Sequence, residues 1–199
     1  MSKLNVRLPD RIIRVSEQIP QIILYIQQII SNGFAYESLG SVYFDSNAYA
    51  KEGYDEVQLD LETIPGKKSP KDFALWKGRE SHLVGFDAEF EFGLMKKSMF
   101  GVPGWHIECS TIIHNSLGTS IDIHFGGIDL KFPHHQNEII QANAFYHPMY
   151  KNKKWCEKFV HIGHLCISGL KMSKSLKNFT TINSALETNT PNQVAFFLT

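Results

Sequence analysis

Isoleucine and valine recur at helical spacing in the first part of the 199-residue chain. The apolar positions are Ile12, Val15, Ile19, Ile22, Ile23, Ile26, Ile29 and Ile30. Residues three and four positions apart share one face of a helix, so this pattern predicts amphipathic helices. Proline is favoured in the first turn of a helix and glycine just after its end. We therefore expect a helical pair, with a second helix that begins near Pro20 and ends at Gly33.

The next segment alternates between apolar and polar residues. FAYESLGSVYFDS, residues 34–46, places a Leu-Gly pair between two alternating runs, which is typical of a β-hairpin. Residues 46–72 are rich in charge, glycine and proline, and are predicted to form a surface excursion. Together these features indicate a small α+β subdomain over residues 1–100.

Helix and strand patterns begin to alternate near Phe100. GVPGWHIECSTIIHNSLG, residues 101–118, predicts a turn followed by a helix that stops at Gly118. SIDIHF, residues 120–125, reads as a strand. Its apolar face would carry Ile121, Ile123 and Phe125.

The same rhythm continues to the end of the chain. PHHQNEIIQANAFYH predicts a helix with Pro133 in its first turn, and KFVHIGHLCI, residues 158–167, predicts a further strand. Alternation of this kind predicts an α/β fold, with a parallel sheet and crossover helices over residues 101–199.

Composition narrows the class of protein. An apolar content of 43% is enough for a buried core and argues against disorder. Lys+Arg and Asp+Glu are balanced at 20 each, so bulk charge gives no argument for a nucleic-acid surface, although Lys171, Lys174 and Lys177 form a local basic patch. Three cysteines and no signal-peptide core indicate a reduced, cytoplasmic protein. The longest apolar stretch, IPQIILYIQQII, is too short to span a membrane.

One candidate metal set can be derived from the residues. His134 and Glu138 are four positions apart, so on a helix both side chains project from one face. Cys109, near the start of another predicted helix, could add a thiolate. Zinc accepts a Cys/His/Glu set and keeps a coordination position open for chemistry. A surface helix with an unrelated histidine and glutamate is the alternative.

Two further motifs contain residues that could bind a nucleotide. Gly126 and Gly127 would let the backbone approach a flat ligand, and Asp129 could hydrogen-bond a ribose, although an ordinary βα turn explains the same letters. KMSKS offers the ammonium groups of Lys171 and Lys174 to the triphosphate of ATP, where charge grows as the α-phosphate is attacked. A lysine-rich surface loop is the alternative.

Three segments together carry a family resemblance. GWHIECS, DIHFGGIDLKFPHHQNEI and GHLCISGLKMSKSLKNF, in this order and spacing, closely resemble cysteinyl-tRNA synthetases, which are class I aminoacyl-tRNA synthetases, and the last is similar to eukaryotic members. The likeness is dense from Ser69 onward, and residues 10–45 resemble the insertion between the halves of that catalytic fold. It implies a connective insertion subdomain at 1–100. Residues 101–199 would form the second half of the Rossmann-type domain.

The resemblance also implies an activity. A cysteine-tRNA ligase activates L-cysteine with ATP and Mg²⁺, releasing pyrophosphate, and transfers the cysteinyl group to tRNA-Cys. Cys109, His134 and Glu138 would hold Zn²⁺, which binds the substrate thiolate and selects it over the serine hydroxyl. The other implied contacts are a pocket wall at Trp105 with His124 close by, adenosine contacts at Gly126, Gly127 and Asp129, and phosphate contacts at Lys174.

The chain departs from the family pattern in several places. The family usually shows three glycines where this chain has Phe125-Gly126-Gly127, and an arginine where it has Val102. HIGH at 161–164 is interpreted as a lookalike on the strand before KMSKS, because the family's motif begins a helix in the first half of the fold. We expect that half, with a fourth cysteine ligand, to be absent, and water or Cys166 to fill the gap. The isolated chain is then expected to be inactive, and a non-catalytic zinc- or nucleotide-binding fragment is the alternative.

Overall fold

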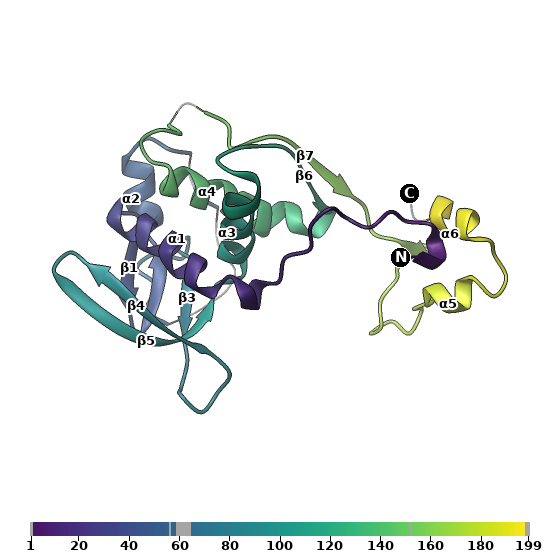
Figure 1. The fold of residues 1–199 in the computed structure, drawn as a ribbon, viewed down its shortest axis with the longest axis horizontal. Coiled ribbons are helices and arrows are strands. Elements are labelled where there is room, and N and C mark those ends of the chain that lie inside the picture. Colours follow the sequence, from purple (N-terminus) through teal and green to yellow (C-terminus); the bar gives the residue numbers. More distant parts are fainter. Residues whose placement is uncertain (1, 56, 59–64, 152, 198–199) are drawn as a thin grey trace. The chain divides into compact units, whose positions relative to one another are not determined.

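The computed structural model describes residues 2–55, 57–58, 65–151 and 153–197 (Figure 1). These residues form two compact units. The main unit contains residues 13–160, and the KMSKS unit contains residues 1–12 and 161–199. Within the described ranges, no helix has the length and apolar character needed to cross a membrane.

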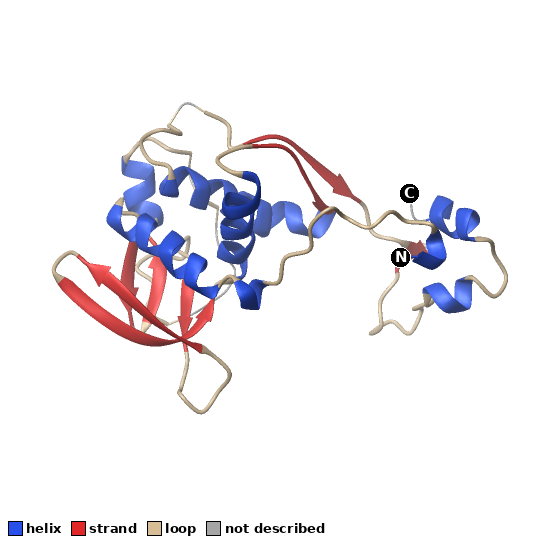
Figure 2. Ribbon diagram, viewed as in Figure 1, coloured by secondary structure: helices blue, strands red, loops and turns tan. Residues whose placement is uncertain are grey.

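A five-stranded antiparallel sheet supports the main unit (Figure 2). Its order is β1-β2-β3-β5-β4, and the bounds are β1 (Ala35–Ser38), β2 (Ser41–Phe44), β3 (Ala74–Gly78), β4 (Phe86–Phe92) and β5 (Met95–Pro103). The predicted hairpin is confirmed, because Tyr36 pairs with Tyr43 across β1 and β2. Leu39 and Gly40 turn the chain with φ of 50° and 73°, the conformation that a tight two-residue hairpin loop requires.

The long apolar run forms one helix rather than two. Helix α1 (Ile19–Ser31) begins with proline in its first turn, and Gly33 follows its end with φ of 85°. Ile22, Ile26 and Ile29 are fully buried against the sheet, so the second predicted helix is confirmed.

The prediction of the first helix of the pair is wrong. Only the short 3-10 turn η2 (Val15–Glu17) forms there, and Ile12 is 74% exposed. An apolar pattern stabilises a helix only where the apolar face finds a surface to pack on. Ile12 has none.

The predicted surface excursion at 46–72 is corrected in part; residues 56 and 59–64 lie outside the described residues. Helix α2 (Ser46–Lys51) buries Tyr49, and the carboxylate of Asp72 is fully buried. Asp72 accepts hydrogen bonds from the backbone and hydroxyl of Ser46, from the backbone of Ser69 and from the hydroxyl of Tyr36. Burial of the charge is tolerated because these donors replace water.

Helix α3 (Trp105–Leu117) follows β5 directly and ends at Gly118, as predicted. Its N-cap, Gly104, lies against β3: a Cβ atom added there would lie 2.0 Å from the carbonyl oxygen of Ala74. Such a contact is far below van der Waals distance, so only glycine lets the start of α3 approach the sheet this closely.

The second predicted strand and helix are also present. Strand β6 (Ile121–Gly127) leads through η3 (Ile128–Leu130) and the distorted turn η4 (Lys131–His135) into α4 (Gln136–Phe145). Regular helix starts later than Pro133 because Phe132 is extended. Strand β7 (Cys156–Ile162) pairs with β6, and both arrows point the same way in Figure 2. This is the βαβ arrangement that an α/β fold requires.

One hydrophobic core joins the layers of the main unit. It contains α1 and the sheet together with Ile107 of α3 and Ile140 and Ala144 of α4. A smaller cluster packs Ile121 of β6 against Trp155 and α4. The elements that hold the candidate site are therefore fixed by burial. The boundary between 1–100 and 101–199 stays a prediction.

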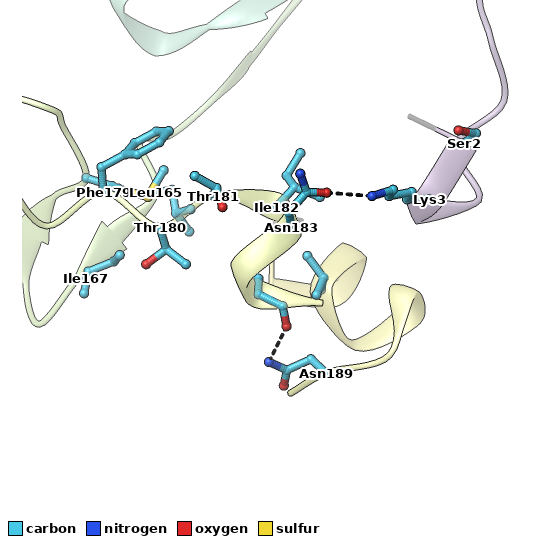
Figure 3. A pocket seen from close by; sticks show the side chains of 13 residues that line it. Ser2, Lys3, Leu165, Ile167, Phe179, Thr180, Thr181, Ile182, Asn183 and Asn189 are labelled. Carbon is cyan, nitrogen blue, oxygen red and sulfur yellow. Dashed lines mark hydrogen bonds between the residues drawn. The ribbon is translucent and has the colours of Figure 1, made fainter. Parts of the chain in front are cut away.

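The KMSKS unit is smaller and more exposed. It contains η1 (Ser2–Leu4), the hairpin β8 (Cys166–Ile167) and β9 (Leu170–Lys171), α5 (Ile182–Ala185) and α6 (Pro191–Phe197). Thr181 caps α5 by accepting a hydrogen bond from the backbone of Ser184. A cavity of about 770 Å³ opens within the unit, with Lys3 bonded to Asn183 at one side (Figure 3).

Candidate functional site

The structure brings Cys109, His134 and Glu138 together in the main unit. One ligand atom from each lies within 4.8 Å of the others. Cys109 comes from the first turns of α3, His134 from the turn before α4 and Glu138 from the first turn of α4. His134 and Glu138 are buried and Cys109 is half-buried, so this is not the solvated helix face of the alternative interpretation.

The carboxylate of Glu138 is the centre of the cluster. It is fully buried; its Oε1 lies 2.7 Å from His134 Nε2, and its Oε2 contacts His124 Nε2. Burial alone would raise the pKa of Glu138, but the imidazoles of His124 and His134 outweigh it and lower that pKa. Both oxygens of this buried carboxylate therefore face imidazole nitrogens rather than water. A buried carboxylate oxygen of this kind suits a cation.

The pKa of the Cys109 thiol also indicates that a cation would fit this cluster. Burial, followed by the carboxylates of Glu138 and Glu108, raises its pKa to about 12. A divalent cation between Cys109 and Glu138 would favour the thiolate and balance the negative charge. The donor set of one sulfur, one imidazole nitrogen and one carboxylate oxygen fits zinc.

Trp105 and His106 support the ring of His134. The indole of Trp105 lies 4.5 Å from that ring between centroids and is half exposed. His106 Nδ1 lies 3.1 Å from His134 Nδ1, which holds that nitrogen and leaves Nε2 directed to Glu138. Sequence reasoning missed His106, although it lies three residues before Cys109 and therefore on the same face of α3.

His135 is a second residue that sequence reasoning missed. His124, His135 and Glu138 also form a close group of potential ligands. The two imidazole rings, however, stack at 4.2 Å with a tilt of 32°. Stacked rings cannot both direct an in-plane nitrogen at one ion without rotating. The pair is better explained as a wall that holds His124 against Glu138.

The glycines after β6 have close neighbours within the main unit. A Cβ atom on Gly126 would lie 2.8 Å from Cε1 of His135, and one on Gly127 would lie 2.5 Å from Oδ1 of Asp129. Gly126 is thus required by the packing of His135. Asp129 lies at the carboxyl end of β6, where the prediction placed it, and Phe125 is 58% exposed. The adenosine contacts of Gly126, Gly127 and Asp129 stay a prediction.

KMSKS lies in the other unit and begins at Lys171, the last residue of β9. Asn178 fixes the start of the motif, because its side chain accepts a hydrogen bond from the backbone of Ser173 and donates one to the carbonyl of Lys171. The Lys174 ammonium lies 5.9 Å from the centre of the Phe179 ring. Both lysine side chains are exposed, as phosphate contact would require.

The position of the HIGH string is also clear. His161 and Ile162 end β7, and no helix begins at residues 161–164 in this described segment. The next elements are β8 and β9, which lead into KMSKS. The predicted place on a strand is confirmed for His161 and Ile162 only, because Gly163 and His164 lie between β7 and β8. Cys166 is exposed in the KMSKS unit, and its role as a further metal ligand stays a prediction.

Comparison with known proteins adds independent information. The family model described as tRNA synthetases class I (C) catalytic domain matches residues 1–199. A cysteine-tRNA ligase of Acanthamoeba polyphaga mimivirus is 55% identical over 97% of this chain and 42% of its own length. A cytoplasmic cysteine-tRNA ligase of Dictyostelium discoideum is 48% identical over 99% of this chain and 31% of its own length. The chain thus spans less than half of each of these relatives.

Proposed function

The chain belongs to the family of class I (C) tRNA synthetase catalytic domains, and we propose that it contributes to cysteine-tRNA ligation. The substrates would be ATP with Mg²⁺, L-cysteine and tRNA-Cys. The observation that carries the proposal is the close group of Cys109, His134 and Glu138 around a fully buried carboxylate, in a chain matched throughout by this family model.

The cluster accounts for the choice of amino acid. When bound, zinc would supply a soft acceptor that prefers the thiolate of cysteine to the hydroxyl of serine. Trp105, half exposed beside His134, would form an apolar wall for the cysteine side chain. His124, held by Glu138 and stacked on His135, would present a fixed imidazole edge next to that wall. Fixed neighbours reduce the entropy lost on substrate binding.

KMSKS would act on the nucleotide. The cysteine carboxylate attacks the α-phosphate, pyrophosphate leaves, and cysteinyl-adenylate forms. Negative charge then grows on the leaving phosphates, where the ammonium groups of Lys171 and Lys174 can stabilise it. Gly126, Gly127 and Asp129, at the end of β6, would hold the adenosine. Transfer to the terminal ribose of the tRNA completes the reaction.

The location follows from the relatives. Those of Dictyostelium discoideum and Xenopus laevis are named cytoplasmic, and we infer the same compartment for this chain.

The test is amino-acid-dependent exchange of pyrophosphate into ATP. Because the chain covers 42% of the mimivirus relative, the assay uses an enzyme of the relatives' length that contains these residues, called here the full-length enzyme. We expect exchange with cysteine and, since a zinc site discriminates by softness, at least about 100-fold less with serine. Zinc binding without exchange would favour a non-catalytic fragment, and equal exchange with serine would contradict the proposed selection by metal.

A further inference from the structure

The hairpin before KMSKS has one polar and one apolar face. Cys166 pairs with Lys171 and Ile167 with Leu170, and a hydrogen bond from the backbone of Met172 to the carbonyl of Leu165 continues the pairing. Directly opposed residues share a face, as do residues two positions apart. His164 therefore shares its face with Cys166 and Lys171.

The opposite face anchors the hairpin. Leu165, Ile167 and Met172 line the cavity of the KMSKS unit together with Phe179 (Figure 3). These apolar contacts fix which way the hairpin faces, since a one-residue slip would exchange the two faces. His164 and Lys171 are thereby held on the side away from the cavity lining.

The two polar side chains meet there. Lys171 Nζ lies 3.3 Å from His164 Nε2. An ammonium group has donors only, so a hydrogen bond between these atoms runs from Nζ to Nε2, with the ring hydrogen on Nδ1. The backbone of Lys171 is already held by Asn178, so the imidazole restrains the remaining mobile part of the residue.

We propose that His164 is a positioning residue for Lys171, the first lysine of KMSKS, and that it orders the ammonium group for contact with the anionic triphosphate. The proposal rests on the proposed function. A lysine side chain has four rotatable bonds, so ordering it before ATP binds reduces the entropy lost on binding. The last histidine of the HIGH string then acts through KMSKS rather than directly on ATP.

The first experiment tests the pairing without activity. Nitrogen NMR of the histidine-labelled 199-residue chain should show His164 with its proton on Nδ1 and an acceptor Nε2. Lys171→Met keeps the stem but removes the donor, so the Nε2 resonance should shift, whereas the matched control Lys174→Met should leave it unchanged. A proton on Nε2, or equal spectra for Lys171→Met and parent, would overturn the pairing.

The second experiment tests its effect in the full-length enzyme. His164→Ala should lower kcat/KM for ATP in the exchange assay about fivefold, the size expected for one exposed charge-assisted contact, with the KM for cysteine unchanged. His164→Gln should restore the rate because its carbonyl oxygen reaches the position of Nε2, whereas that of His164→Asn stops near Nδ1. In a Lys171→Ala background, His164→Ala should have no further effect.

The outcomes separate the two proposals. A parent enzyme without cysteine-dependent exchange overturns the proposed function and with it the catalytic use of the pair. An active parent with no effect of His164→Ala, or with equal losses in His164→Gln and His164→Ala, overturns the positioning role alone.

Discussion

The candidate metal cluster and the KMSKS loop hold their charged side chains in different ways. Glu138 and His134 are buried and each has its neighbours fixed by helix packing, whereas Lys171 and Lys174 are exposed and are held by a few contacts within one turn. Discrimination between two nearly isosteric amino acids requires a rigid site, because small errors in ligand position remove the preference. Stabilising a transient phosphate charge requires donors directed at the position where that charge grows. This difference predicts that substitutions in the cluster change the binding of zinc, and that substitutions in the loop change the rate of adenylation.

The largest effect should come from removing the thiolate of the cluster. Cys109→Ser replaces a soft ligand with a hydroxyl that does not ionise, so zinc in the purified 199-residue chain should fall from about one per chain to nearly none. Metal analysis measures it, with Cys156→Ser as the control, because Cys156 is buried in the same unit but lies outside the set. Equal zinc in Cys109→Ser and parent would rule out the proposed centre.

Lys174→Ala should have the next largest effect and should sharpen the contrast. In the full-length enzyme we expect adenylation to slow about 100-fold, because a preorganised charge in the transition state is lost, while cysteine affinity stays the same. Single-turnover kinetics and cysteine titration give the two quantities. Lys177→Asn is the matched control, since Lys177 has φ of 54° and asparagine tolerates that conformation. An unchanged adenylation rate in Lys174→Ala would mean that KMSKS is only a basic surface turn.

His106→Ala tests whether the cluster depends on its support. The variant removes the group beside His134 Nδ1, so zinc affinity should fall about tenfold while the chain stays folded. Competition with a chelator measures affinity, and circular dichroism checks the fold. His114→Ala alters a part-buried histidine away from the cluster and should leave affinity unchanged. The support role fails if both variants bind zinc like the parent.

The HIGH string should show a smaller effect. His161 lies at the end of β7 and is half-buried, so His161→Asn in the full-length enzyme should slow adenylation less than about fivefold, as for one surface contact. A loss above about 100-fold would mean that residues 161–164 touch the phosphates, as a transition-state contact would. The HIGH string would then belong to the catalytic site and not to the strand before KMSKS.

Acidification should produce the smallest effect, through His114. Burial lowers the pKa of His114, so the folded state disfavours its protonated form. Its contribution to stability is present above the unfolded pKa of about 6.5 and is lost as the pH falls below it. Thermal unfolding between pH 7.5 and 5.5 should therefore show a smaller loss in His114→Asn than in the parent. His82→Asn alters an exposed histidine and should lose as much thermal stability on acidification as the parent. An equal loss in all three proteins would show that His114 does not cause the pH dependence.

Local patterns predicted the elements well where burial agreed with them. Helix α1, the β1–β2 hairpin and the end of α3 at Gly118 follow from apolar spacing and turn residues. The helix expected around Ile12 failed because spacing does not reveal whether a partner surface exists. The surface excursion was corrected because the burial of Asp72 depends on Tyr36, a residue 36 positions away.

The candidate site shows the same limit. His134 and Glu138 could be paired from their spacing, and Cys109 from its chemistry. The spacing of His106 places it on the face of Cys109, but its contact with His134 depends on the packing of α3 against η4, and the position of His135 depends on a glycine in β6. Residues that support a site are recognised by distance in space, and a single sequence does not contain that distance.

Gly104 has a consequence for variant interpretation. Its missing Cβ lets the first turn of α3 lie against the carbonyl of Ala74, five residues before Cys109. Any larger residue would shift the beginning of that helix, and the thiol would move with it. A screen that measures only metal content would classify Gly104 as a metal ligand, although the added atom contacts the sheet and not the metal. Loss of cofactor is therefore not sufficient evidence that a substituted residue binds it.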